Sequence, residues 1–255
     1  MAELSLIVHE SQQDNRIKIL SLNRPKQLNA MNGDMLHELR EQLDHLARNP
    51  TMGALVITSE LTRAFCSGID MSFVQELSNT DAAQFFAMLA DTLEQLIHFP
   101  APTIAAVNGY AFGAGADLAL ACDLRVAGAS SRFRFPGPQF GVVLGTQRLS
   151  HEVGPSRARL LALTGQTVDA REAQQYGLVH QVTEDESCLE TALALAATFI
   201  HMPSYTLHTI RDICRKDEAR GESRSCANEW ARKSVLEGDF RERFSQFVNQ
   251  ARDRK

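Results

Sequence analysis

The hydrophobic positions of this chain fall into short continuous runs and longer helical stripes. Short apolar runs closed by turn residues favour buried strands, and they cover residues 4–8, 17–22, 54–58, 103–107, 124–127 and 178–182. Apolar residues at helical spacing predict helices near 32–48, 81–98, 116–122, 145–153, 155–163 and 169–176. From residue 187 onwards the pattern is helical. Strands that alternate with helices, followed by a helical tail, predict an α/β fold.

Several helix ends carry recognisable signals. Asn32 is placed to cap the helix that follows it, and Asp169 with Glu172 forms the pattern of a capping box. Gly177 is expected to end that last helix. The apolar face of the tail has no obvious partner within the tail itself, so we expect it to pack on a neighbouring subunit.

Residues 103–123 are the central stretch, which we interpret as a strand, a loop of small residues and the start of a helix. Gly109, Gly113 and Gly115 lie in the loop, where glycine lets a backbone approach a ligand closely. The free N–H groups of a helix start favour negative charge. Phosphate binding, oxyanion stabilisation and plain tight packing all use this geometry, but the G-x-G-x-x-G fingerprint of dinucleotide folds is absent.

Composition narrows the function classes. Hydrophobic residues make up 44% of the 255 positions, charged residues 22%, and the formal net charge is −5. This charge offers no electrostatic case for nucleic acid or an anionic membrane. The five cysteines are scattered without a C-x-x-C pair, which indicates reduced thiols and no metal site. No signal peptide or membrane span is visible, so we predict a cytoplasmic protein.

Four motifs together resemble the crotonase (enoyl-CoA hydratase/isomerase) superfamily. They are LNRPKQLNA at 22–30, RAFCSGID at 63–70, IAAVNGYAFGAGADL at 104–118 and GTQRL at 145–149. They occur in the family's order and span nearly the whole chain. The resemblance implies a spiral of repeated ββα units in residues 1–190 that carries an acyl-CoA site. It also implies a helical region in residues 191–255 that builds a homotrimer, or a hexamer made of two trimers.

The resemblance also implies roles for individual residues. The backbone N–H groups of Ile69 and Ala114 would hold the thioester oxygen of an acyl-CoA, and Asp117 would act as acid/base. No cofactor is expected besides the CoA thioester substrate. Arg24 and Lys26 are candidate phosphate partners, and the alternative for each is a solvated surface charge. The expected CoA contacts are Arg24, Lys26, Leu28, Ala64, Cys66, Ser67, Ile69 and Asp70.

The chain departs from the family pattern at a second acid/base position. Hydratases of the family carry two glutamates; here Asp117 stands at one position and Gly137 at the other. Gln139 could position a water, but it cannot act as a base. The segment 141–145 is also about three residues shorter than usual. Asp117 itself could instead be a helix-start aspartate bonded to backbone N–H groups, and Cys66 is expected to pack rather than react.

Three hypotheses remain open. The first is an enzyme that hydrates enoyl-CoA, or isomerises its double bond, through an enolate held by Ile69 and Ala114, with Asp117 as the only matched acid/base. The second is decarboxylation or thioester hydrolysis, which needs less acid/base equipment. The third is an acyl-CoA-binding protein without chemistry, which the missing carboxylate at Gly137 motivates.

Overall fold

The computed structural model describes residues 5–218, 225–237 and 239–253. The first residue of the predicted strand 4–8 and part of the predicted tail therefore lie outside the described residues. Within them, no helix is long and apolar enough to cross a membrane.

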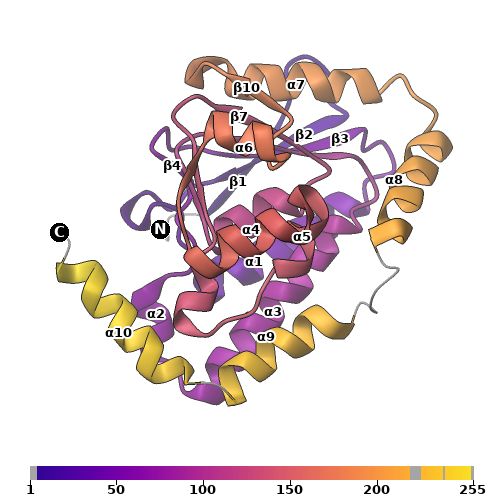
Figure 1. The fold of residues 1–255 in the computed structure, drawn as a ribbon. Helices are drawn as coiled ribbons and strands as arrows, with labels where there is room; N and C mark the ends of the chain where they lie inside the picture. Colours follow the sequence, from indigo (N-terminus) through magenta and orange to yellow (C-terminus); the bar gives the residue numbers. More distant parts are fainter. Residues whose placement is uncertain (1–4, 219–224, 238, 254–255) are drawn as a thin grey trace.

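Ten strands in the described residues form two sheets (Figure 1). The larger sheet has the order β1 (Leu6–Glu10), β2 (Ile17–Leu22), β3 (Ala54–Ser59), β5 (Thr103–Val107), β7 (Leu124–Gly128) and β10 (Gln181–Thr183). The smaller sheet has the order β4 (Ala64–Cys66), β6 (Tyr110–Phe112), β8 (Arg132–Arg134) and β9 (Val168–Asp169). Pairing is parallel except between β1 and β2 and between β8 and β9.

The helices and short 3₁₀ turns complete the order of elements. The α-helices are α1 (Gly33–Ala47), α2 (Met71–Glu76), α3 (Asn79–Ile97), α4 (Ala114–Leu120), α5 (Thr146–Thr164), α6 (Ala170–Tyr176), α7 (Cys188–Phe199), α8 (Ser204–Glu218), α9 (Ser225–Glu237) and α10 (Phe240–Asp253). The 3₁₀ turns are η1 (Pro25–Gln27), η2 (Gly137–Phe140) and η3 (Asp185–Ser187). The chain passes from the larger sheet to the smaller sheet and then into a helix in β3–β4–α3, β5–β6–α4 and β7–β8–α5. This repeat confirms the predicted α/β spiral of ββα units.

The larger sheet separates two hydrophobic layers because successive side chains of a strand point to opposite faces. On one face, Val56, Ile104 and Val126 pack against α7. On the other face, Ile57 and Val107 belong to the main core, which the helices on that side complete. Figure 1 shows α7 on one side of the sheet and α1, α3 and α4 on the other. The loops that leave the parallel strands therefore meet beside the main core.

Most long elements lie where the pattern predicted them. The α1 helix begins after Asn32, whose side chain accepts a hydrogen bond from the Met35 N–H, and it buries the five apolar residues of its stripe. The capping box of Asp169 and Glu172 is present, and Gly177 ends α6 in a left-handed conformation. The two helices predicted on either side of Gly154 form α5 with a kink. The signals for these elements come from residues that are close together in the sequence, so they can be recognised without the tertiary structure.

The predictions were wrong for several short elements. No strand was predicted in the segments 62–70, 108–115 and 132–141, which contain β4, β6 and β8. Each of these strands has three residues, too few to show an alternating pattern, and each exists because it pairs with strands distant in sequence. The α2 helix was missed, and the last strand lies at β10 rather than at 178–182.

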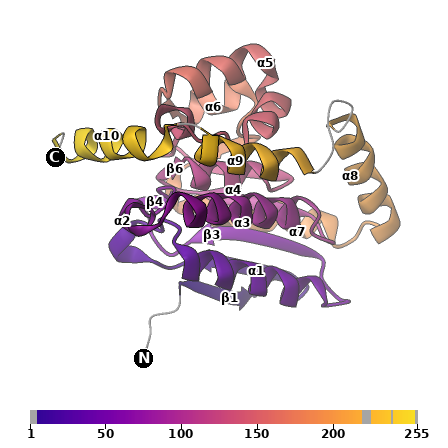
Figure 2. The same ribbon diagram turned by 90° about the horizontal axis from the view of Figure 1, so that it is seen from below.

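The expectation that the apolar face of the tail packs on a neighbouring subunit needs a correction for α9 and α10. The α9 helix lies along α3 (Figure 2), and its Ala231 and Val235 are buried there. The α10 helix buries Phe240 and Phe244 in the core of the same chain. The apolar faces of these two helices therefore have their partners within the chain. The predicted boundary at residue 190 falls inside α7, which packs on the larger sheet.

Arg125 on β7 is a fully buried cation that ties β7 to the segments around it. Its Nε donates to the Leu178 carbonyl over 2.6 Å, its Nη1 donates to the Cys122 carbonyl over 2.8 Å, and its Nη2 pairs with Glu152 of α5. Removing one member of a buried ion pair leaves the other without its compensating charge.

We expect Arg125→Leu to lower the free energy of unfolding by about 3 kcal/mol, because Glu152 and two carbonyl groups lose their donor. Urea denaturation measures the change. Arg171→Leu on α6, an exposed arginine, is the matched control and should change stability by less than about 0.5 kcal/mol. Equal stability of the two variants would contradict the role assigned to Arg125.

Candidate functional site

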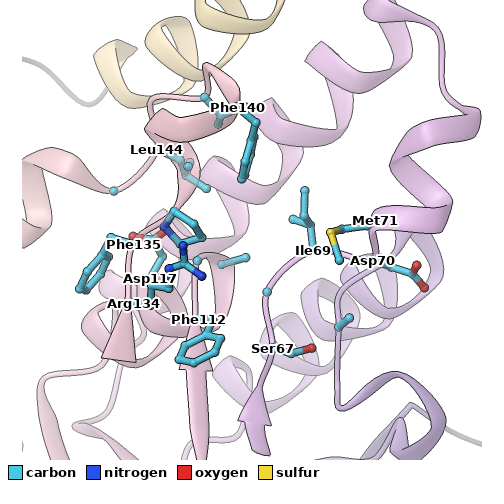
Figure 3. A pocket seen from close by; sticks show the side chains of 18 of the residues that line it. Ser67, Ile69, Asp70, Met71, Phe112, Asp117, Arg134, Phe135, Phe140 and Leu144 are labelled. Carbon is cyan, nitrogen blue, oxygen red and sulfur yellow. The ribbon is translucent and has the colours of Figure 1, made fainter. Parts of the chain in front are cut away.

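A mostly apolar cavity of about 560 Å³ lies between the ends of the smaller sheet, α4, η2 and α10. Figure 3 shows Ile69 and Met71 on one side of it and Asp117 and Arg134 on the opposite side. The charged residues that line the cavity are Lys26, Asp70, Asp117 and Arg134. A large apolar cavity with a few charged groups is the usual form of a small-molecule site.

Two loops meet at one wall of this cavity in direct backbone contact. A Cβ placed on Gly115 would lie 2.2 Å from the Cys66 carbonyl oxygen, and one on Gly68 would lie 2.9 Å from the Phe112 carbonyl oxygen. Gly68 also has a φ of +108°, which side-chain-bearing residues rarely adopt. Because β4 and β6 pair in parallel, the loops that follow these two strands come together at this contact. Glycine is therefore required here by both space and backbone conformation.

The Ile69 N–H and the Ala114 N–H are free donors at this wall. The Met31 N–H donates to the Gly68 carbonyl over 2.7 Å, and the Met31 carbonyl accepts from the Asp70 N–H over 2.8 Å. Because these two bonds flank Ile69 in a parallel bridge, the Ile69 N–H points away from Met31. Ala114 opens α4, and the first N–H groups of a helix have no acceptor within it. Within the described residues neither N–H meets a protein acceptor, and both residues line the cavity.

Asp117 projects from the first turns of α4 into the cavity and is 4% exposed. Burial raises the pKa of its carboxyl from 3.8 to about 7, although the positive charge of Arg148 opposes that rise. No described group donates a hydrogen bond to its Oδ1. The alternative that Asp117 is a helix-start aspartate held by backbone N–H groups therefore finds no support, and the carboxyl is available for chemistry.

The predicted CoA contacts separate into two groups. Lys26, Leu28, Ser67, Ile69 and Asp70 line the cavity. The Ser67 N–H donates to the Leu28 carbonyl over 3.0 Å, which joins the two segments that carry these residues. The cavity wall thus includes the loop around η1 and the loop after β4.

Arg24, Ala64 and Cys66 do not line the cavity. Arg24 instead pairs with Asp70 at 2.9 Å, and its Nη1 donates to the Ala30 carbonyl over 2.6 Å. Asp70 in turn accepts hydrogen bonds from the backbone of α2 and caps that helix. This network fixes the loop that carries Ile69.

The side chain of Cys66 is buried behind the loop contact. Its Sγ lies 3.0 Å from the Asn29 carbonyl oxygen, and desolvation raises the pKa of the thiol to about 12. A thiol that stays protonated at neutral pH is a poor nucleophile. The structure therefore agrees with the expectation that Cys66 packs rather than reacts.

The second acid/base position of the family pattern holds no carboxylate. Gly137 lines the cavity at the start of η2, and a Cβ there would lie 3.1 Å from the Val142 carbonyl oxygen. Gln139 is not among the lining residues. Its Nε2 donates to the Thr164 carbonyl and its Oε1 accepts from Arg134, so its amide is engaged outside the cavity.

Sequence reasoning missed the aromatic wall of the cavity. Its members come from α3, η2 and α10 and are Phe86, Phe140, Phe244 and Phe247. The Phe140 ring lies 5.6 Å from that of Phe244 and 5.2 Å from that of Phe247. The abundance of phenylalanine in 133–140 and 240–247 was the available signal, but only the fold shows that these segments meet. No group of three or more potential metal ligands occurs among the described residues.

The fold and the cavity define an α/β protein of ββα units whose cavity is lined by a buried carboxyl group and by two residues with unbonded backbone N–H groups among the described residues. The chain belongs to the enoyl-CoA hydratase/isomerase family, because the model of that family matches residues 12–250. A 2,3-dehydroadipyl-CoA hydratase of Escherichia coli K12 is 39% identical over 220 residues, which cover 84% of this chain and 82% of the relative. A crotonyl-CoA hydratase of Syntrophomonas wolfei is 34% identical over 192 residues, which cover 74% of each chain.

Solved structures agree with this assignment. An enoyl-CoA hydratase/isomerase from Xanthobacter autotrophicus Py2 has a TM-score of 0.86 and 26% identity, with 98% of this chain and 93% of that chain covered. An enoyl-CoA hydratase from Bacillus anthracis has a TM-score of 0.81 and 26% identity, with 97% of both chains covered. The protein is therefore an acyl-CoA enzyme of the enoyl-CoA hydratase/isomerase type.

We expect Gly115→Ala to lower the free energy of unfolding by about 2 kcal/mol and to reduce activity, because the added methyl group overlaps the Cys66 carbonyl. Urea denaturation and a turnover assay measure the two effects. Gly154→Ala is the matched control: its φ is +76° but nothing lies within 4 Å, so it should cost only about 1 kcal/mol and leave activity intact. Full stability and activity of the Gly115 variant would refute the proposed loop contact.

We expect Asp117→Asn to stabilise the protein increasingly as the pH rises. Below about pH 4 the carboxyl is protonated in both the folded and the unfolded state, so replacing it with an amide changes the free energy of unfolding little. Between pH 3.8 and about 7 the unfolded state ionises first, and wild-type stability falls. Above pH 7, the free energy of unfolding of the variant, measured by urea denaturation, should exceed that of the wild type by about 4 kcal/mol. Asp239→Asn, at an exposed site, is the control, and a pH-independent difference for Asp117→Asn would contradict the buried ionisation.

Proposed function

We propose that the protein hydrates the double bond of enoyl-CoA thioesters, with Asp117 as the single acid/base and the N–H groups of Ile69 and Ala114 as oxyanion donors. The observation that carries this proposal is the buried Asp117 carboxyl, with a pKa of about 7, in a cavity that also holds two unpaired backbone donors. A group that must both accept and donate a proton works best with a pKa near the working pH.

One carboxyl group suffices for a balanced reaction. The oxygen of a water attacks Cβ while the ionised Asp117 accepts a water proton, and the electron pair of the double bond moves through Cα onto the thioester oxygen. The Ile69 and Ala114 N–H groups stabilise that negative charge; one such donor typically contributes about 3 kcal/mol. Asp117 then gives its proton to Cα, and the thioester carbonyl re-forms.

The lining of the cavity supports an acyl-CoA orientation. Lys26 is exposed beside Leu28 and Ser67, where its charge can meet a CoA phosphate, whereas Arg24 is engaged with Asp70. The aromatic wall accommodates an apolar acyl group. Relatives named as 2,3-dehydroadipyl-CoA and crotonyl-CoA hydratases favour an enoyl thioester as the substrate.

Double-bond isomerisation is the second candidate. Isomerases of the family usually carry their acid at the position that is Gly137 here, so Asp117 would have to move the proton instead. With a single carboxyl group, Asp117 can remove a proton from one carbon and return it to another without a water. The same oxyanion donors would stabilise the dienolate. A 3-enoyl-CoA substrate distinguishes the two reactions because its isomerisation creates the conjugated thioester that hydration consumes.

The proposal includes assembly into a homotrimer or a hexamer in the cytoplasm. Exposed apolar side chains support an interface between copies: Tyr205, Ile210 and Ile213 on α8 and Leu163 on α5. None of these four residues lines the cavity.

We expect crotonyl-CoA to lose its ultraviolet absorbance in the presence of the protein, and kcat/KM to rise with pH through a midpoint near 7 as Asp117 ionises. Asp117→Asn should lower kcat by at least about 10²-fold while acyl-CoA affinity, measured by calorimetry, is kept.

Asp34→Asn, which changes an exposed aspartate on α1, is the control for this assay and should keep wild-type turnover. Turnover that survives Asp117→Asn would remove Asp117 from the chemistry. Binding without turnover of either crotonyl-CoA or the 3-enoyl isomer would favour a decarboxylase, a thioesterase or a binding protein.

A further inference from the structure

Arg148 is a partly buried cation behind the proposed acid/base. It lies on the first turn of α5, and its Nε and Nη2 atoms are buried without a hydrogen-bond partner among the described residues. Buried guanidinium groups are normally paired, because desolvating the charge is costly. An arginine in this condition calls for an explanation beyond packing.

Gly145 places Arg148 and Asp117 next to each other. It caps the start of α5 with a φ of +66°, and a Cβ there would lie 1.8 Å from Asp117 Oδ1. The carboxyl group of Asp117 therefore rests directly on the turn from which Arg148 projects. Asp117 Oδ1 is itself buried and has no partner among the described residues. The Asp117 carboxyl group and the partly buried Arg148 guanidinium therefore lie at the same turn, carry opposite charges and have no direct bond to each other among the described residues.

Two carboxylates near Arg148 pair with other arginines. Arg148 lines a second cavity of about 320 Å³, next to Asp123 and Glu152. Asp123 pairs with Arg211 at 2.9 Å, and Glu152 pairs with Arg125. The charged and titratable groups around the pair are Lys26, Asp70, Tyr110, Cys122, Asp123, Arg125, Arg134, His151, Glu152, Arg211 and Cys214.

We propose that Arg148 is a positioning residue whose guanidinium charge keeps the ionised form of Asp117 accessible at neutral pH. A carboxylate buried in an apolar cavity would otherwise hold its proton well above neutrality. A nearby positive charge favours the ionised form, and the absence of a direct bond leaves the carboxylate free to accept a proton. The electrostatic effect of Arg148 on the pKa of Asp117 has this sign. The inference rests on the proposed function, because it serves the acid/base role of Asp117.

Carbon-13 NMR of protein labelled at the aspartate side-chain carboxyl tests the inference directly. Asp117→Asn identifies the resonance of Asp117 by its loss. In wild-type protein its titration midpoint should lie near pH 7. In Arg148→Gln and Arg148→Met the midpoint should move up by about one pH unit, since an opposite charge has been removed. Arg148→Lys should restore a midpoint close to that of the wild type.

Arg159→Gln is the matched control, because it removes the same charge from an exposed position of α5. Its midpoint should equal that of the wild type. Circular dichroism identifies which variants fold, and the two neutral replacements at Arg148 keep the test available if one of them does not. An unchanged midpoint in a folded neutral variant would overturn the inference, as would an equal shift in Arg159→Gln.

The pH dependence of kcat/KM separates this inference from the proposed function. If both are correct, the kinetic midpoint moves upward together with the NMR midpoint in the neutral Arg148 variants. If the NMR midpoint moves and the kinetic midpoint does not, Arg148 controls the ionisation of Asp117 but Asp117 is not the acid/base. A neutral variant in which neither midpoint moves contradicts the role of Arg148 whatever its activity.

Discussion

The site depends on one backbone contact, the approach of the loop after β4 to the start of α4. Gly115 and Gly68 have no room for a side chain, since their Cβ positions fall against the carbonyl oxygens of Cys66 and Phe112. This contact sets the Ile69 and Ala114 N–H groups at one wall of the cavity. Backbone donors held in this way cannot rotate away as side chains do, so the packing itself organises the polar part of the site.

Near this contact, a buried ionisable group lowers the stability of the folded protein. Asp117 is buried in an apolar cavity, and burial raises the pKa of its carboxyl to about 7, which penalises its ionised form. Two other carboxylates of the protein, by contrast, have charged partners. Asp70 pairs with Arg24 and caps α2, and Asp123 pairs with Arg211. Perturbed, unpartnered groups in a cavity are typical of functional sites.

Family membership fixes the class of chemistry, while local departures shape how this chain performs it. Gly137 leaves Asp117 without a second carboxyl group in the place where the family pattern has one. Gly145 lies against Asp117, and Arg148 follows on the first turn of α5. The aromatic side chains of η2 and α10 close the opposite end of the cavity.

The sequence by itself determined the long helices and strands, the α/β class and the family, and it singled out Ile69, Ala114 and Asp117, which the structure brings to one cavity. These features have local signals: apolar periodicity, capping residues and glycine motifs. The three-residue strands, the pairing of Arg24 with Asp70 and the meeting of Asp117 with Arg148 were decided only by the tertiary structure. Each of them joins segments distant in the chain, and pairing, burial and charge proximity across such distances leave no periodic trace in a single sequence.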